Sequence, residues 1–275
     1  MAKNDSPNVT NIPANQHFFE SLLEWLLINF PQNNSQDLSK AKIFLPNQRS
    51  CREFRELFLQ RSVQSKQEKP VILPNIKAIS DISFEDFFDF LPNEDAKEAI
   101  DEILQIKLIS GIDYLFFLSQ KIQKLSLFGE NLESNQALNI AINLKSLFDE
   151  IEKDEIDLDK LAQVDDSDLS MHRQITLDFL KNFHIEIRNS LIKENIFFSS
   201  SYHNFIVDKF SFCLEKYGSK LPIIIAGSTG SLSSGKKLIK AISSQENGHA
   251  IIHGLDPLSQ SYQQEYHPQF LRKSR

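Results

Sequence analysis

Leu221-Pro-Ile-Ile-Ile-Ala-Gly-Ser-Thr-Gly-Ser231 is the stretch that indicates the fold most clearly. Its apolar, β-branched run from Ile223 to Ala226 is short and ends at Gly227, which is typical of a strand buried on both faces of a parallel sheet. A pattern with helical spacing follows, and then a second strand from Ala250 to His253. This order predicts a strand-loop-helix-strand unit. Ligands of open α/β sheets bind beyond the carboxyl ends of the strands, so the small-residue loop is a candidate contact surface.

The same loop contains a partial match to a phosphate-binding loop, Gly230-Ser-Leu-Ser-Ser-Gly235-Lys236-Lys237. A working loop needs Ser or Thr after its lysine to hold magnesium, and Lys237 takes that place. The first glycine also follows the strand too distantly. The first turn of the chain, Pro13 to His17, contains neither glycine nor lysine and cannot cradle phosphates either. We therefore expect a tight turn with a serine N-cap and two exposed lysines, and no nucleotide cofactor.

Composition sets outer limits on the function. The 275 residues carry a formal net charge of -7, which argues against a protein that is basic overall but leaves room for a local cationic patch. Cys51 and Cys213 have no partner at disulfide or zinc spacing, so we expect two core residues and no metal site. The acidic run from Asp149 to Asp168 is interpreted as a solvated linker. The polar start and the lack of a membrane-length apolar stretch predict a cytoplasmic protein without membrane contact.

The first part of the chain, residues 1–82, alternates predicted strands with helices. Strands are expected at Asn8–Ile12, Ala41–Leu45 and Val71–Ile79, the last at a sheet edge because Pro74 interrupts it. A helix is expected from about Phe18 to Phe30. Pro46-Asn47-Gln48-Arg49-Ser50 leads into a second helix that runs to about Gln60, where Cys51, Phe54 and Phe58 mark the buried side.

The middle of the chain, residues 83–217, shows only one-sided helical stripes and no convincing strand. One stripe is formed by Ile100, Ile103, Leu104 and Leu108. We expect an all-helical insertion between the strands of one α/β sheet, with residues 218–275 forming the second part of the α/β domain.

Three arginines recur at steps of three near the start of the second predicted helix: Arg49, Arg52 and Arg55. They share a face next to the carboxyl edge of the sheet, where cations can contact DNA phosphates. The alternative is a solvated helix face on which they pair with Glu53 and Glu56.

Four segments in this order resemble the amino-terminal part of the AddB family, the second subunits of bacterial AddAB helicase-nucleases. They are Ile43-Phe-Leu-Pro-Asn-Gln-Arg-Ser-Cys-Arg-Glu-Phe-Arg-Glu-Leu-Phe58, Ala226-Gly-Ser-Thr-Gly-Ser231, Gly254-Leu-Asp256 and His267-Pro-Gln269. The similarity runs from about Val9 to Leu271 and is closest to the type whose first domain lacks a working phosphate loop.

The resemblance implies an inactive, superfamily 1 helicase-like domain with a parallel sheet like that of P-loop helicases and a helical insertion. It implies a role in processing DNA double-strand breaks for recombinational repair, with an AddA-like subunit and DNA ends as partners. No catalysis is expected from this chain alone, although the family complex is an ATP-dependent helicase and exodeoxyribonuclease. The residues implied in DNA or subunit contact are Arg49, Arg52, Arg55, Gly227, Ser228, Thr229 and Ser231.

One departure from the family leaves a second hypothesis open. AddB subunits are several times longer, and their nuclease carboxylates and iron-sulfur cysteines lie near the carboxyl end. We therefore expect a piece of a split subunit, an excised domain, or the remnant of a broken gene. The alternative function is an interaction scaffold without DNA binding, which predicts arginines paired with acids and an exposed apolar docking face.

Overall fold

The computed structural model describes residues 8–30, 38–64, 73–90, 93–125, 132–162, 170–230 and 233–255. Ser231, Asp256 and the His267-Pro-Gln269 segment lie outside the described residues. The chain divides into two compact units, one formed by Met1–Ile100 and Ile206–Arg275 and the other by Asp101–Phe205. The second unit falls within the predicted insertion, residues 83–217.

The first unit contains a five-stranded sheet in which every paired strand is parallel, as the sequence predicts. The strands in spatial order are β1 (Val9–Ile12), β7 (Gly248–His253), β6 (Ile223–Ala226), β2 (Lys42–Leu45) and β3 (Asn75–Ala78). All residues of β6 and β2 are buried, because both strands are covered on two faces. β3 lies at the edge, in agreement with the position of Pro74.

The helices of this unit connect the strands or cover them. They are α1 (Phe18–Asn29), α2 (Gln48–Gln64), α3 (Glu85–Phe90), most of α4 (Asn93–Leu104), α10 (Ser233–Ser243) and the later turns of α9 (Ser199–Tyr217). Two short 3₁₀ turns, η1 (Leu38–Lys40) and η2 (Ile79–Asp81), flank β2 and β3. The chain passes between the units within α4 and within α9.

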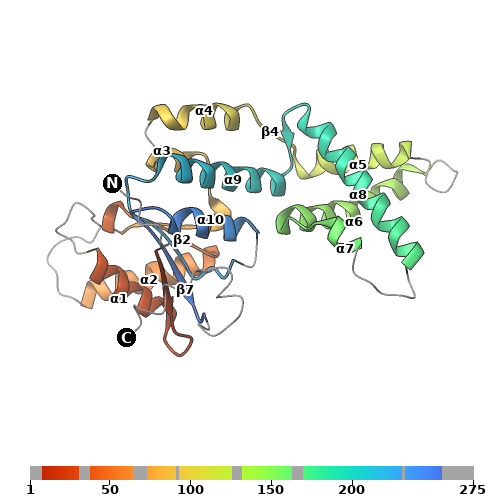
Figure 1. The fold of residues 1–275 in the computed structure, drawn as a ribbon. Helices are drawn as coiled ribbons and strands as arrows, with labels where there is room; N and C mark the ends of the chain where they lie inside the picture. Colours follow the sequence, from red (N-terminus) through yellow and green to blue (C-terminus); the bar gives the residue numbers. More distant parts are fainter. Residues whose placement is uncertain are drawn as a thin grey trace. The chain divides into compact units, whose positions relative to one another are not determined.

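Alternate residues of β2 enter cores on the two faces of the sheet. Ile43 and Leu45 join a cluster with residues of α1 and α2, including the predicted core residues Phe54 and Phe58. The intervening Phe44 contacts Phe210 of α9 on the other face, with ring centroids 6.0 Å apart. Figure 1 shows the same layering, with α1 and α2 on one face of the sheet and α10 on the other.

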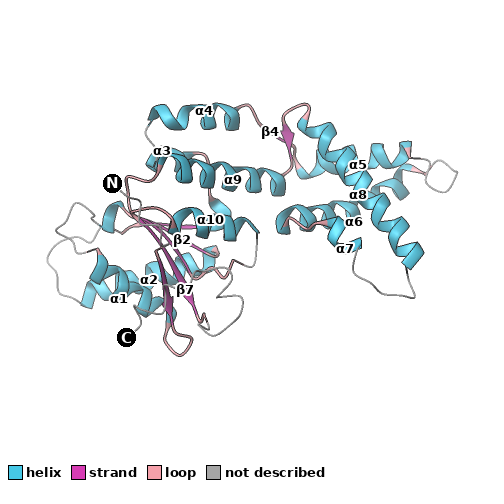
Figure 2. Cartoon of the chain, in the orientation of Figure 1, coloured by secondary structure: helices cyan, strands magenta, loops and turns pink. Residues whose placement is uncertain are grey.

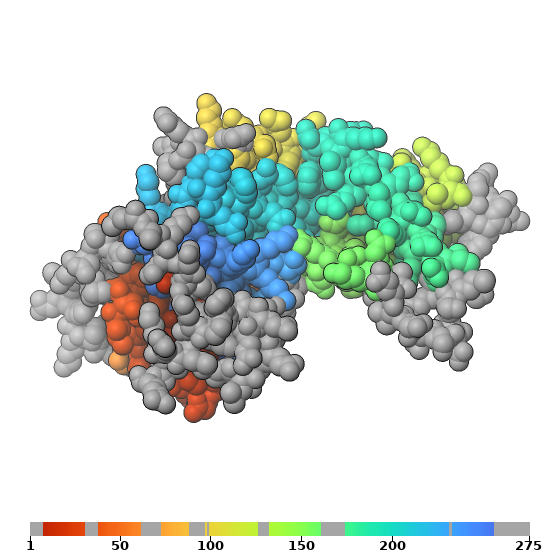
Figure 3. All heavy atoms as spheres, in the orientation of Figure 1, coloured from red at the N-terminus to blue at the C-terminus, as the bar shows by residue number. Residues whose placement is uncertain are grey.

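α10 lies beside the part of α9 that belongs to the first unit. Lys237 on α10 forms an ion pair of 2.8 Å with Asp208 on α9. In the space-filling view, the blue atoms of α10 adjoin the cyan atoms of α9 (Figure 3). These two helices therefore belong to the layer that covers the second face of the sheet.

The second unit is built from helices and one pair of very short strands. The helices are α5 (Gly111–Lys124), α6 (Ser134–Asp154), α7 (Leu158–Ala162), α8 (Ser170–Ile192) and the first turns of α9. The strands β4 (Lys107–Leu108, labelled in Figure 2) and β5 (Ile196–Phe197) pair in parallel. The expected all-helical insertion is corrected on this point, because two-residue strands are too short to leave a periodic pattern.

The core of the second unit includes polar groups from the start of the acidic run. Apolar residues of α5, α6 and α8 pack together, among them Leu118, Phe148 and Ile187. Glu152 of α6 is also buried, and its Oε1 lies 3.0 Å from Nε2 of His184. The interpretation of Asp149–Asp168 as a solvated linker is thus wrong for its first members. Among the described helices, none is long and apolar enough to cross a membrane.

Candidate nucleic-acid interface

The neighbouring strands β2 and β6 form a topological switch point at the carboxyl edge of the first unit's parallel sheet. β2 and β6 are neighbours, but the helices that follow them, α2 and α10, cover opposite faces of the sheet. The loops after β2 and β6 therefore diverge. In open α/β sheets, this divergence opens the crevice in which ligands bind. The connection Pro46–Asn47 follows β2 and the loop Gly227–Gly230 follows β6, and the two lie next to each other at this edge.

The loop after β6 begins with a backbone conformation that favours glycine. Gly227 has a φ of +72°, and its N–H donates to the carbonyl of Ile251 on β7 over 2.8 Å. A Cβ at this position would lie 2.8 Å from the ring of Phe18 and 3.7 Å from Cδ of Pro46. The loop is thus held close to α1 and to the residue that follows β2, where only glycine fits without strain.

The rest of this loop turns back onto the first turn of α10. The N–H of Gly230 donates to Oγ of Ser228 over 3.4 Å. That Oγ would also lie 3.4 Å from a Cβ at Gly235. Thr229 is exposed at the tip of the turn, whereas Ser228 is half-buried. Of the four loop residues expected to make contacts, Thr229 offers the most accessible side chain among those described.

The second half of the partial phosphate-loop match belongs to a helix. α10 begins at Ser233, so Gly235 and Lys236 already belong to the helix. Lys237, which stands where a magnesium-binding hydroxyl is needed, pairs with Asp208. The turn after β1 is closed by a hydrogen bond of 3.1 Å from the N–H of Gln16 to the carbonyl of Pro13. The described residues of these two segments are thus arranged as a helix start and a closed turn.

The start of α2 carries exposed cations at the carboxyl edge of the sheet. Asn47 is the N-cap, because its Oδ1 accepts from the N–H of Ser50 over 2.9 Å. The first turn contains no acidic residue, and Arg49 and Arg52 are both exposed. The positive end of the helix dipole and two guanidinium groups thus coincide at the carboxyl edge.

Arg49 and Arg52, here called the arginine pair, form no ion pair with any described acidic residue. The acids considered as their partners, Glu53 and Glu56, are themselves exposed on α2. At the same edge, the carboxylate of Asp81 accepts a hydrogen bond from the side chain of Gln48. The arginine pair is therefore available to an external anion.

Arg55 differs from the other two arginines. It is half-buried, and its Nη2 donates to the main-chain carbonyl of Ile76 on β3. This bond ties α2 to the edge strand. Of the three arginines grouped by their spacing, two face solvent and one is occupied by the backbone.

The sequence did not reveal a buried ion cluster that joins β2, β3 and α3. Lys42 of β2 and Asp86 of α3 are each only 2% exposed and form an ion pair. Lys77 of β3 adds a second ammonium 2.8 Å from Asp86, and the N–H of Ser83 donates to the same carboxylate. Burial alone would raise the pKa of Asp86, but the hydrogen bonds from Lys42 and Lys77 outweigh it and lower the pKa. The cluster fastens α3 to β2 and β3, the two strands that α2 connects.

Comparisons with models of known protein families and with curated proteins find no match to this chain. The α/β fold with its parallel five-stranded sheet stands on the structure alone.

Proposed function

We propose that the chain is a non-catalytic, helicase-like segment of an AddB-type subunit that contacts DNA during the processing of double-strand breaks. The observation that carries the proposal is the arginine pair, Arg49 and Arg52. Both are exposed at the start of α2, next to the topological switch point between β2 and β6. The resemblance in sequence supplies the class of partner: DNA ends and an AddA-like subunit.

The chemistry of the edge suits phosphate better than it suits a base or a neutral ligand. Guanidinium groups donate to phosphate oxygens in a planar fork, and a helix N-terminus adds favourable potential. Contacts of this kind position a protein on the DNA backbone and carry no sequence information themselves. We therefore infer binding that is independent of sequence and sensitive to salt.

The described residues of the two segments compared with a phosphate loop support a non-catalytic role. Ser233 to Lys237 belong to α10, and Pro13 to Gln16 form a turn after β1. A segment of this type contributes DNA or subunit contacts, while ATP hydrolysis belongs to a partner.

The alternative function is an interaction scaffold or a remnant without DNA binding. The two hypotheses are separated by fluorescence anisotropy of a labelled duplex with an exposed end, titrated with the purified chain across a salt series. DNA contact predicts binding that weakens as salt rises. A folded chain that fails to bind at low salt contradicts DNA contact and leaves the scaffold.

A further inference from the structure

The short strand β4 of the second unit has one paired edge and one free edge. On the paired side, the N–H of Lys107 donates to the carbonyl of Asn195 over 2.8 Å. The N–H of Ile109 donates to the carbonyl of Phe197 over 3.0 Å. Alternate residues of a strand direct their main-chain groups to opposite edges, so the N–H and C=O of Leu108 face away from β5. Both groups lack a hydrogen-bond partner among the described residues.

Ser110 lengthens this free edge. Its backbone is extended, with φ of -65° and ψ of 154°, and α5 begins at the next residue, Gly111. The N–H of Ser110 lies on the same side as the main-chain groups of Leu108, two residues earlier. It also has no acceptor in the part of the chain that the structure describes. The edge therefore offers the N–H and C=O of Leu108 and the N–H of Ser110 to an added strand.

The first unit protects a comparable edge. The N–H of Asn75 donates to Ala41 on the β2 side, so the next residue of β3, Ile76, directs its main-chain groups outward. Arg55 covers this edge by donating to the carbonyl of Ile76. Natural sheets guard open edges with charged groups in this way. At the β4 edge no described side chain bonds to Leu108, whose own apolar side chain is 57% exposed.

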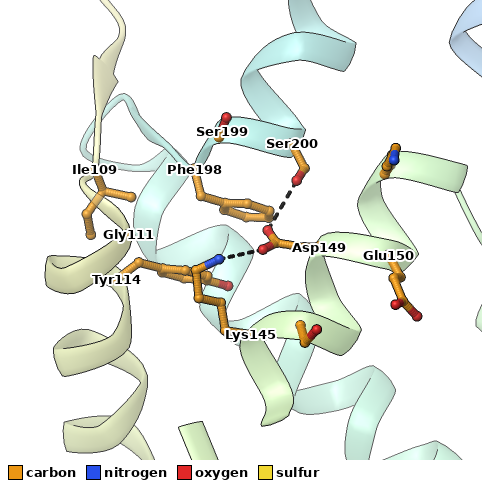
Figure 4. Close-up of a pocket in the computed structure, with 11 residues that line it drawn as sticks. Ile109, Gly111, Tyr114, Lys145, Asp149, Glu150, Phe198, Ser199 and Ser200 are labelled. Atoms are coloured by element: carbon orange, nitrogen blue, oxygen red, sulfur yellow. Dashed lines mark hydrogen bonds and ion pairs between the residues drawn. The ribbon is translucent and has the colours of Figure 1, made fainter. Parts of the chain in front are cut away.

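Two apolar side chains of α5 face the same way as this free edge. Tyr114 of α5 stacks on Phe198, which directly follows β5, with ring centroids 5.0 Å apart. Figure 4 shows the two rings together on the inner side of α5. Ile112 and Phe116 each lie two residues from Tyr114, which is about 160° around the helix. They therefore point away from β5, as the free edge does, and are 68% and 56% exposed.

The charge of the second unit favours a cationic occupant over a second copy of the chain. Residues 101–205 contain 18 acidic and 10 basic side chains, a formal net charge of -8, so the total of -7 leaves +1 for the first unit. Around the edge, between residues 101 and 116, the exposed acids Asp101, Glu102 and Asp113 outnumber one exposed base, Lys107. Two such surfaces repel each other, whereas a segment that carries lysine or arginine is attracted.

We propose that β4 accepts an added strand from a partner protein, an extended segment that alternates apolar and cationic side chains. Its main chain pairs with Leu108 and Ser110, and its apolar side chains cover Ile112 and Phe116. In this mode of recognition, main-chain hydrogen bonds provide affinity and alternate side chains provide specificity. The proposal is independent of DNA contact by the first unit.

The test titrates the full chain with a short, end-blocked peptide of alternating valine and lysine. Amide NMR should show saturable shifts at Leu108, Ser110 and Ile112, and the anisotropy of a labelled peptide gives the affinity. Two further peptides carry N-methyl groups on all valines or on all lysines. One of them should bind about tenfold more weakly, because it loses the N–H groups that face β4. A peptide with glutamate in place of lysine should bind severalfold more weakly. No saturable shift with the parent peptide, or equal affinity for all four, overturns the proposal.

Variants of the chain locate the site. Leu108→Pro removes the outward N–H but keeps the bonds of Lys107 and Ile109 to the β5 side, so the peptide should bind about tenfold more weakly. Ile112→Ser should weaken binding severalfold. Ile175→Ser is its matched control, because Ile175 is 61% exposed and lies in α8 at the end far from β5. Where circular dichroism shows that Leu108→Pro does not fold, the comparison of Ile112→Ser with Ile175→Ser decides. Equal affinities of these two variants contradict the site.

Sedimentation analysis of the parent chain tests the other occupant. The proposal predicts a monomer in the absence of peptide. A dimer that Leu108→Pro dissociates would show that a second copy of the chain covers the edge, and would contradict a cationic partner.

Discussion

The guanidinium of Arg55 donates a hydrogen bond to the main-chain carbonyl of Ile76, and so links α2 to the edge strand β3. The neighbouring Arg49 and Arg52 make no such contact and face solvent. This difference separates a stabilising arginine from two that are available to a ligand.

Arg55→Ala should therefore lower stability more than DNA affinity. Loss of a hydrogen bond from a charged donor, partly screened by solvent, should cost about 1–2 kcal/mol in the free energy of unfolding. Urea denaturation followed by circular dichroism measures this change. Stability equal to that of the parent chain would show that the bond to Ile76 contributes nothing.

Gly227→Ala tests the close approach of the β6 loop to α1. The positive φ of Gly227 and a Cβ only 2.8 Å from the Phe18 ring should together destabilise the first unit by about 1–3 kcal/mol. Gly111→Ala is the matched control, because a Cβ there meets nothing within 4 Å. It should be neutral or slightly stabilising in the same denaturation experiment. Equal effects of the two substitutions would contradict the packing described at Gly227.

Asp86→Asn should be strongly destabilising, because it removes the buried carboxylate that pairs with the ammonium groups of Lys42 and Lys77. The expected loss is about 3–5 kcal/mol. Asp208→Asn, which breaks the half-exposed pair with Lys237, should cost less than about 1 kcal/mol. A small loss in Asp86→Asn would show that the buried cluster does not hold α3 in place.

The same carboxylate should contribute to acid denaturation. The pKa of Asp86 is lowered in the folded protein, so its contribution is present above the unfolded value of about 3.9 and is lost as pH falls through the lowered value. Stability measured between about pH 6 and pH 2 should therefore fall less steeply in Asp86→Asn than in the parent chain. Parallel curves for the two proteins would contradict the assignment.

Much of the first unit follows from local sequence. The β-branched run Ile223–Ala226 forms a fully buried strand, and Pro74 precedes an edge strand, because both signals act within a few residues. Leu104 and Leu108 were expected in one buried stripe but are 62% and 57% exposed. α4 ends at Leu104 and the chain enters β4, a change that periodicity does not reveal.

The sequence predicted only part of the candidate site, and the reason is geometric. Steps of three residues drift around a helix of 3.6 residues per turn, so Arg49 and Arg55 point about 120° apart. Sequence spacing grouped the three arginines. Only the position of β3 shows that Arg55 donates its hydrogen bond to the main chain of Ile76. The Lys42–Asp86 pair joins residues 44 positions apart, and no local pattern predicts such a contact. The free edge of β4 likewise depends on its pairing with β5, which is distant in sequence.

The most direct test of the central claim compares two charge-matched double variants in the anisotropy assay on a duplex end, at roughly 50 to 200 mM salt. Arg49→Ala/Arg52→Ala removes the arginine pair. Arg61→Ala/Lys240→Ala removes two exposed cations from the last turns of α2 and α10, at the amino edge of the sheet. DNA contact at the carboxyl edge predicts weaker binding and a salt slope flatter by about two units for the first variant only. Equal weakening by both variants, or unchanged binding by Arg49→Ala/Arg52→Ala, would contradict it.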